Sequence, residues 1–357
     1  MSKQHHNSSS SRHSFLSRKV PVGYTFILTL LVAGAAFYIT REAYTSVHTP
    51  SNETESSPSD RSQYQIKRLS NFKFIRPLLS AMPVDEYEGY FRIKKSVQDV
   101  IQYFKDQGVL ASASFYMRDF DKSNWTAINQ DEKFHPGSIM KIPVLMTILK
   151  SEEERPGYVD STMQFIYHFR YAIPKKQSIV SKQIEFGKRY SRRDLLKYMI
   201  EYSDNNASEM LWITMNKNSF SDMFREFGLA KPDLSAGEIP LSARECSLFM
   251  ETLFNATYLN IKQSEFAIDL LSKSTFSDGI VKGIPGGKLL IAHKFGESGS
   301  DRNRELHETG LLYIDDRPYL ITIMTRGQDN VEYAKLATVL QGISRTVYYG
   351  LTEKDHR

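Results

Sequence analysis

The sequence predicts an α+β protein, an α/β sandwich in which N-terminal and C-terminal segments build one antiparallel sheet and an all-helical subdomain is inserted between them. Strand patterns occur in two groups far apart along the 357 residues. Helical periodicity fills the region between these groups and flanks them on both sides. A charge-free run ahead of all these elements predicts one transmembrane helix before the domain.

The N-terminal region predicts a membrane anchor. Residues 1–19 form a basic, acid-free tail, and residues 20–40 carry no charge, which is long enough to cross a hydrocarbon core of ~30 Å. The positive-inside rule places the tail in the cytoplasm and everything after the helix outside. A cleaved signal peptide is the alternative, because Ala33–Ala36 offers small residues. The polar residues 41–71 predict a flexible tether to a domain over 72–357.

Charge and cysteine content exclude several classes of function. The net charge is +5, but four basic residues of the tail supply most of it, and the nearly neutral remainder argues against nucleic-acid binding. The single cysteine, Cys246, rules out an intrachain disulfide and lies in a helical run, where we expect a buried apolar residue rather than a catalytic thiol. His5, His6 and His307 lack metal-ligand spacing. We therefore expect no metal, no cofactor and a monomer.

The first elements of the domain follow from periodicity. Phe72–Pro83 is apolar but broken by proline and predicts a strap packed on the domain. Ile93–Gln107 has apolar residues at helical spacing and ends before Gly108. Leu110–Phe120 and Trp125–Asn129 predict two strands joined by a polar turn.

The remaining elements alternate between a helical block and a strand-rich end. Ser242 stands three residues before Glu245, the spacing of a capping box. We expect helices over Met140–Lys150, Arg193–Tyr202, Ala207–Met215, Leu241–Phe254, Phe266–Ser272 and Val331–Tyr349, and strands over Leu289–Lys294, Gly310–Tyr313 and Tyr319–Thr325.

Three short motifs carry chemistry. Ser138-Ile139-Met140-Lys141 opens an apolar helix, so the hydroxyl and the amine lie on one helix face. Ser203-Asp204-Asn205 follows a helix, and Lys294-Phe295-Gly296 ends a strand. A serine hydroxyl needs a base to become nucleophilic, and a lysine can serve when burial or a neighbouring cation lowers its pKa. Ser70–Lys73 also fits the first pattern, but no buried helix follows it.

Together and in this order, the motifs resemble S-x-x-K, S-D-N and K-T-G, the signature of class A β-lactamases and penicillin-binding proteins. The resemblance covers roughly Ile93 to Tyr349. It implies that Ser138 is the nucleophile, that Lys141 takes its proton and that Ser203 passes a proton to the leaving nitrogen. The resemblance also implies substrate-binding roles for Asn205, Lys294, Gly296 and Glu297, with the backbone N–H groups of Ser138 and Glu297 as the oxyanion hole. Asp204 would orient its loop.

Two departures from the family pattern stand out. Phe295 replaces the hydroxyl residue of K-T-G, which helps to bind a substrate carboxylate. The E-x-x-L-N motif that supplies the deacylating glutamate of class A enzymes is missing. The nearest glutamate is Glu238, in Glu238-Ile239-Pro240-Leu241-Ser242, and it is either that base or an ordinary surface residue.

The resemblance implies a membrane-anchored, extracytoplasmic serine hydrolase that opens β-lactam amides through a Ser138 acyl-enzyme. Two alternatives share the acylation residues: a D-alanyl-D-alanine peptidase that acts on peptidoglycan stem peptides, and a penicillin-binding sensor or silent cell-wall binding domain. The missing deacylation motif favours the last of these.

Overall fold

The computed structural model describes residues 64–70, 72, 74–166, 179, 181–235, 239–286 and 289–352. All of them belong to one compact unit, residues 62–357. The predicted cytoplasmic tail, the predicted transmembrane segment and Glu238 lie outside the described residues. Across the described part of the chain, none of the helices has the length and apolarity needed to span a bilayer.

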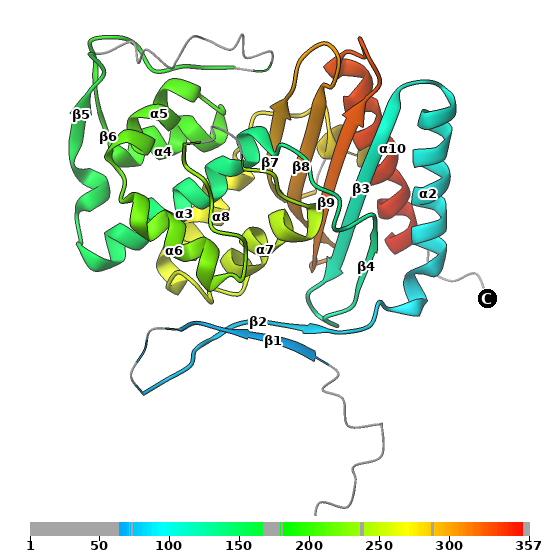
Figure 1. Cartoon of the computed structure of the whole chain (residues 1–357), viewed down its shortest axis with the longest axis horizontal. Coiled ribbons are helices and arrows are strands. Elements are labelled where there is room, and N and C mark those ends of the chain that lie inside the picture. Colours follow the sequence, from blue (N-terminus) through cyan, green and yellow to red (C-terminus); the bar gives the residue numbers. More distant parts are fainter. Residues whose placement is uncertain are drawn as a thin grey trace, which may run out of the picture. The chain divides into compact units, whose positions relative to one another are not determined.

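A five-stranded antiparallel sheet forms the centre of the domain, with the strand order β4-β3-β9-β8-β7 (Figure 1). The N-terminal strand β3 pairs directly with the C-terminal strand β9, with Phe115 opposite Ile323. The predicted antiparallel sheet from both ends of the domain is therefore confirmed. The strands are β3 (Leu110–Asp119), β4 (Trp125–Ile128), β7 (Ile291–Ser298), β8 (Glu305–Ile314) and β9 (Arg317–Gly327).

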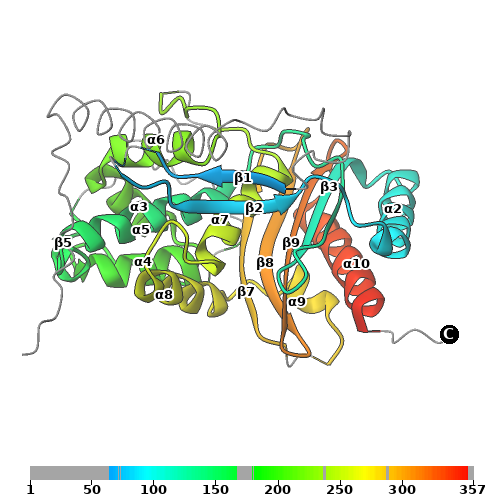
Figure 2. The same cartoon turned by 90° about the horizontal axis from the view of Figure 1, so that it is seen from below.

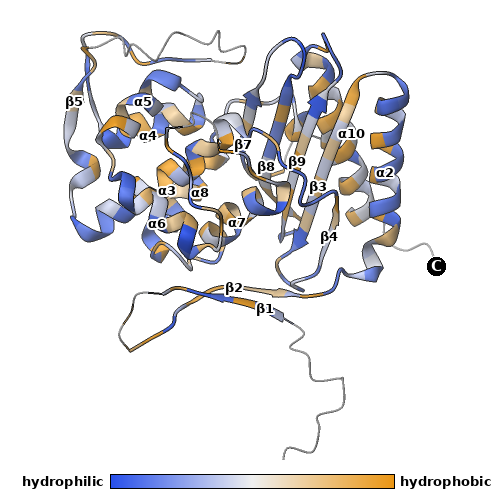
Figure 3. Ribbon diagram, in the orientation of Figure 1, coloured by the Kyte–Doolittle hydropathy of each residue, from blue (hydrophilic) through white to orange (hydrophobic). Residues whose placement is uncertain are grey.

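Helices α2 (Phe91–Asp106) and α10 (Tyr333–Thr352) lie side by side along one face of this sheet. Helix α2 buries Ile93, Val97 and Ile101, and its outward turns are hydrophilic (Figure 3). This spacing is the one that predicted the helix. The short α9 (Ile280–Gly283) packs against α10.

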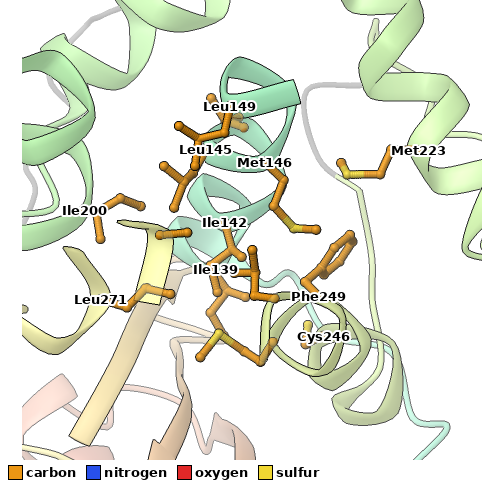
Figure 4. Close-up of a cluster of buried hydrophobic side chains, with 14 of the residues drawn as sticks. Ile139, Ile142, Leu145, Met146, Leu149, Ile200, Met223, Cys246, Phe249 and Leu271 are labelled. Carbon is orange, nitrogen blue, oxygen red and sulfur yellow. The ribbon is translucent and has the colours of Figure 1, made fainter. Parts of the chain in front are cut away.

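The predicted helical subdomain packs on the other side of the sheet. Its central helix, α3 (Lys141–Glu154), is buried along most of its length, as expected of an apolar run. Around it lie α4 (Arg192–Glu201), α5 (Asn205–Thr214), α6 (Lys217–Glu226), α7 (Ala243–Phe254) and α8 (Ile261–Ser272). Figure 4 shows Ile142, Leu145, Met146 and Leu149 of α3 packed among Ile200, Met223, Phe249 and Leu271 of four other helices. Short elements complete the subdomain: η3 (Tyr158–Asp160), β5 (Thr162–Gln164) and β6 (Arg189–Ser191).

Two local predictions in α7 are confirmed. The Ser242 side chain accepts a hydrogen bond from the Glu245 backbone, and the Glu245 side chain accepts one from the Ser242 backbone, which is a capping box. Cys246 is fully buried, and burial raises the pKa of its thiol. It therefore serves as a small core residue. Helix α6, by contrast, was not predicted, although it buries Phe220, Met223 and Phe224 at helical spacing.

A hairpin precedes the sheet domain, formed by β1 (Tyr64–Arg68) and β2 (Leu78–Pro83). Figure 2 shows it running across α7. The predicted strap over Phe72–Pro83 is thus partly a strand, and β1 lies within the segment predicted as a tether. The buried Arg118 holds the hairpin, because it donates to Ala81 O at 2.7 Å and pairs with Glu251 of α7 at 2.7 Å. The turn η1 (Glu88–Tyr90) then leads into α2.

Candidate active site

Ser138 lies in a 3-10 turn, η2 (Gly137–Met140), that leads directly into α3. This turn is in close contact with strand β7. Gly137 has a φ of +53°, and a Cβ at this position would lie 2.3 Å from Glu297 O. A Cβ at Gly296 would lie 2.1 Å from Pro136 O and 3.1 Å from Ser138 N. Both positions require glycine, and their close approach places the backbone of Ser138 beside that of β7.

Lys141 follows one turn after Ser138 and is 5% exposed. Its Nζ donates to Ser203 O at 2.6 Å, to Asn205 Oδ1 at 2.7 Å and to Ser203 Oγ at 3.2 Å. Burial lowers the pKa of Lys141 to about 7, although the charges of Asp204 and Glu297 oppose this effect. A large fraction of Lys141 is therefore a neutral amine near pH 7, as a general base requires.

Ser203 occupies the junction between α4 and α5 with a φ of +57°, a left-handed conformation that is uncommon outside glycine. The neighbouring Asp204 explains how this conformation is held. Its carboxylate accepts hydrogen bonds from Ile184 N at 2.8 Å and from Asn206 N at 2.9 Å, and it caps α5. Asp204 therefore orients the loop, as the resemblance implies, and a strained residue at this point is typical of functional sites.

Lys294 lies in β7 and is fully buried. Its Nζ donates to Ser203 Oγ at 2.9 Å and to Phe295 O at 3.0 Å. Burial, and then the charge of Lys141, lowers the pKa of Lys294 well below its ordinary value. The Ser203 hydroxyl thus lies between two lysine amines that come from segments far apart in the sequence.

A cavity of about 700 Å³ opens at this cluster. Its polar lining residues include Ser138, Lys141, Asn205 and Glu297. Its apolar lining residues are Met140, Val144, Trp212, Phe220, Leu234 and Ile239, together with Pro136. Ser203, Lys294 and Gly296 are buried and are not among the residues that line the cavity. The described residues hold no group of three or more potential metal-binding side chains.

Comparisons with known proteins show the family and the fold of the chain. The sequence profile of the beta-lactamase enzyme family (Beta-lactamase2) matches residues 92–351. The chain belongs to this family. A search of curated protein sequences gives no match.

Solved structures share the fold of this beta-lactamase family chain. One is the structure of PBP-A, with a TM-score of 0.59 at 18% identity, covering 73% of this chain and 97% of that protein. A class A beta-lactamase from Mycobacterium abscessus has a TM-score of 0.59 at 17% identity, covering 72% and 99%. A beta-lactamase from Burkholderia phymatum has a TM-score of 0.62 at 14% identity, covering 74% and 100%.

Phe295, which stands in place of the hydroxyl residue of K-T-G, is buried in this chain. Its side chain is 3% exposed and stacks on Phe276, with 4.3 Å between the ring centres. The same ring lies 4.1 Å from Lys294 Nζ, a cation–π contact. Phe295 does not line the cavity. The position therefore supports the buried lysine and brings no hydroxyl to a substrate.

A polar network next to the turn that holds Ser138 was missed by sequence reasoning. The buried carboxylate of Glu305 accepts from His135 N at 2.8 Å and from Arg326 Nε at 2.7 Å. Ser298 Oγ donates to His135 O at 2.7 Å, and His307 Nε2 lies 3.1 Å from the same oxygen. These contacts hold the chain just before Gly137. No sequence signal distinguishes them, because the partners come from β7, β8 and β9.

Proposed function

We propose that this chain is a serine hydrolase that opens β-lactam amides through an acyl-enzyme on Ser138. One observation carries the proposal: the Ser203 hydroxyl lies within hydrogen-bonding distance of Lys141 and Lys294, beside the turn that holds Ser138. Burial keeps much of Lys141 neutral near pH 7. The site therefore combines a base, a proton donor and a nucleophile around one cavity.

The proposed acylation is balanced in protons and bonds. Lys141 takes the hydroxyl proton of Ser138, whose Oγ bonds to the carbonyl carbon of the lactam. Backbone N–H groups of Ser138 and Glu297 stabilise the oxyanion, at roughly 3–4 kcal/mol for each donor. Ser203 then donates its proton to the lactam nitrogen as the C–N bond breaks, and Lys141 returns a proton to Ser203 Oγ. Asn205, which lines the cavity and holds Lys141, is placed to bind the substrate amide.

Support for the choice of substrate comes from one neighbour. A point mutant of PBP-A is described as an acyl-enzyme complex with penicillin G, and its fold matches this chain with a TM-score of 0.58 at 17% identity, covering 73% and 97%. Penicillin G is therefore the first probe to use.

The D-alanyl-D-alanine peptidase and the penicillin-binding sensor are the second candidates. They are favoured by the missing E-x-x-L-N motif, because without a deacylating group a β-lactam would leave a lasting adduct. We also propose that residues 20–40 anchor the domain on the outer face of the cytoplasmic membrane, supported by the charge-free run and the basic tail before it.

The test is the intact mass of the protein followed over time after penicillin G is added. We expect a Ser138 adduct that is short-lived while opened penicillin accumulates in solution. Ser138→Ala abolishes both signals, and Ser70→Ala, in the other S-x-x-K copy, changes neither. A lasting adduct without product identifies the peptidase or the sensor. If the wild type forms no adduct and no product, like Ser138→Ala, the proposal is wrong.

A further inference from the structure

Glu209 lies on α5 one turn after Asn205. Residues four apart on a helix share a face, and both side chains line the cavity that contains Ser138 and Lys141. The helix that begins at Asn205 thus places the Glu209 carboxylate in the same cavity as Ser138, although Glu209 belongs to none of the three motifs.

The surroundings of Glu209 suit a general base. Apolar Trp212, Phe220 and Ile239 line the same cavity, and burial raises the pKa of the Glu209 carboxyl, while the charge of Lys217 on α6 opposes this. Within the described part of the chain, the Glu209 carboxylate makes no hydrogen bond and has no ion pair within 4.0 Å. A carboxylate with no hydrogen-bonding partner among the described residues, in the same cavity as Ser138, is available to bind and deprotonate a water molecule.

The two other carboxylates of the cavity, Asp233 and Glu297, and the amine of Lys141 differ from Glu209 in position or in partners. The Asp233 carboxylate accepts from Ser235 N at 2.9 Å and from Ser235 Oγ at 2.6 Å, which closes an exposed turn. Glu297 lies on β7, on the side of the expected oxyanion donors. Lys141 donates to Ser203 O, Ser203 Oγ and Asn205 Oδ1 and is the base of the proposed acylation step.

We propose that Glu209 is the general base that hydrolyses the Ser138 ester, in place of a loop glutamate. This inference rests on the proposed function. Glu209 takes one proton from a water molecule, and the water oxygen bonds to the ester carbonyl carbon. The tetrahedral intermediate then breaks its bond to Ser138 Oγ, and that oxygen takes the proton back from Glu209. The net reaction consumes one water and releases a carboxylic acid and the free serine.

The test separates acylation from deacylation in Glu209→Gln. The variant is mixed with penicillin G, and the Ser138 adduct is followed by intact mass as it forms and decays. We expect adduct formation at the wild-type rate, which also shows that the variant is folded, and decay about 10²–10⁴-fold slower. Glu265→Gln, on an exposed position of α8, is the matched control and should decay like the wild type.

Three results would overturn the inference. The first is an adduct on Glu209→Gln that decays as fast as the wild-type adduct. This result excludes Glu209 as the base, while the proposed acylation of Ser138 still stands. The second is slow decay in Asp233→Asn or Glu238→Gln but not in Glu209→Gln, which assigns the base to the residue that was changed. The third is a wild-type adduct that never decays. If neither the wild type nor Glu209→Gln is acylated, the proposed function itself is wrong.

Discussion

The side-chain nitrogen of Lys294 lies 2.9 Å from the hydroxyl oxygen of Ser203, although the two are 91 positions apart in the sequence. The same oxygen lies 3.2 Å from Lys141 Nζ. Each lysine is buried, and the charge of Lys141 further lowers the pKa of Lys294. Protonating both lysines at once is therefore unfavourable, and the shared hydroxyl is a path along which one proton can move between them.

The first prediction concerns the pH dependence of acylation. The pKa of Lys141 is lowered to about 7, and only the neutral amine accepts a proton from Ser138. The acylation rate should therefore rise about tenfold per pH unit below 7 and level off above it. The acylation rate is measured between pH 5 and pH 9 by quenching the reaction at set times and determining the intact mass of the protein. A flat profile across pH 7, or one that Lys141→Met leaves unchanged, would contradict Lys141 as the base.

The second prediction tests the close approach of η2 to β7. A Cβ at Gly296 would lie 2.1 Å from Pro136 O, so Gly296→Ala must push the turn that holds Ser138 away from the strand. Misplacing a reacting group by about 1 Å costs roughly 10²-fold in rate, so we expect Gly296→Ala to lower the acylation rate by about this factor. Gly108→Ala is the control, because its Cβ would meet no atom within 4 Å and its cost is confined to the left-handed backbone. Equal acylation by Gly296→Ala and the wild type would show that this contact does not position the nucleophile.

The third prediction concerns the missing hydroxyl of K-T-G. Phe295→Thr removes a buried ring that packs on Phe276 and lies beside Lys294 Nζ. The free energy of unfolding, measured in urea, should fall by about 3 kcal/mol. Because position 295 does not line the cavity, the new hydroxyl should not tighten penicillin binding. Phe276→Leu is the control that loses the ring contact without adding a hydroxyl. Tighter binding by Phe295→Thr would show that the position can face the substrate.

The fourth prediction concerns the network next to the turn that holds Ser138. Burial raises the pKa of the Glu305 carboxyl. The interactions with His307, the His135 backbone and Arg326 outweigh this effect and bring the pKa down to about 2. A carboxyl whose pKa is lower in the folded state than its ordinary value of 4.5 stabilises the fold above that value, and this stability is lost as the pH falls toward 2. Glu305→Gln should therefore cost on the order of 3 kcal/mol at pH 7 and much less near pH 2. Urea unfolding at the two pH values measures the difference, and an equal cost at both would refute the charge-based explanation.

Sequence periodicity was a reliable guide where burial is local. The helix that became α2 and the apolar run that became α3 show their buried faces in the spacing of their own residues. The β3 and β9 strands were likewise recognisable, although their pairing was inferred from element order alone. The hairpin strand β1 was not predicted, because it is short and its residues are mostly exposed. Its order depends on pairing with β2 and on Arg118 from another strand.

The sequence by itself determined the motif residues and their order, because a nucleophile, an amine and a proton donor are chemical types that a chain displays directly. Only the tertiary structure decided how they act together. The Lys141 pKa near 7, the buried position of Phe295 and the placement of Glu209 in the cavity depend on burial and on neighbours from distant segments. Electrostatic environment is a property of three-dimensional surroundings, so a one-dimensional pattern identifies the groups but not their protonation or their partners.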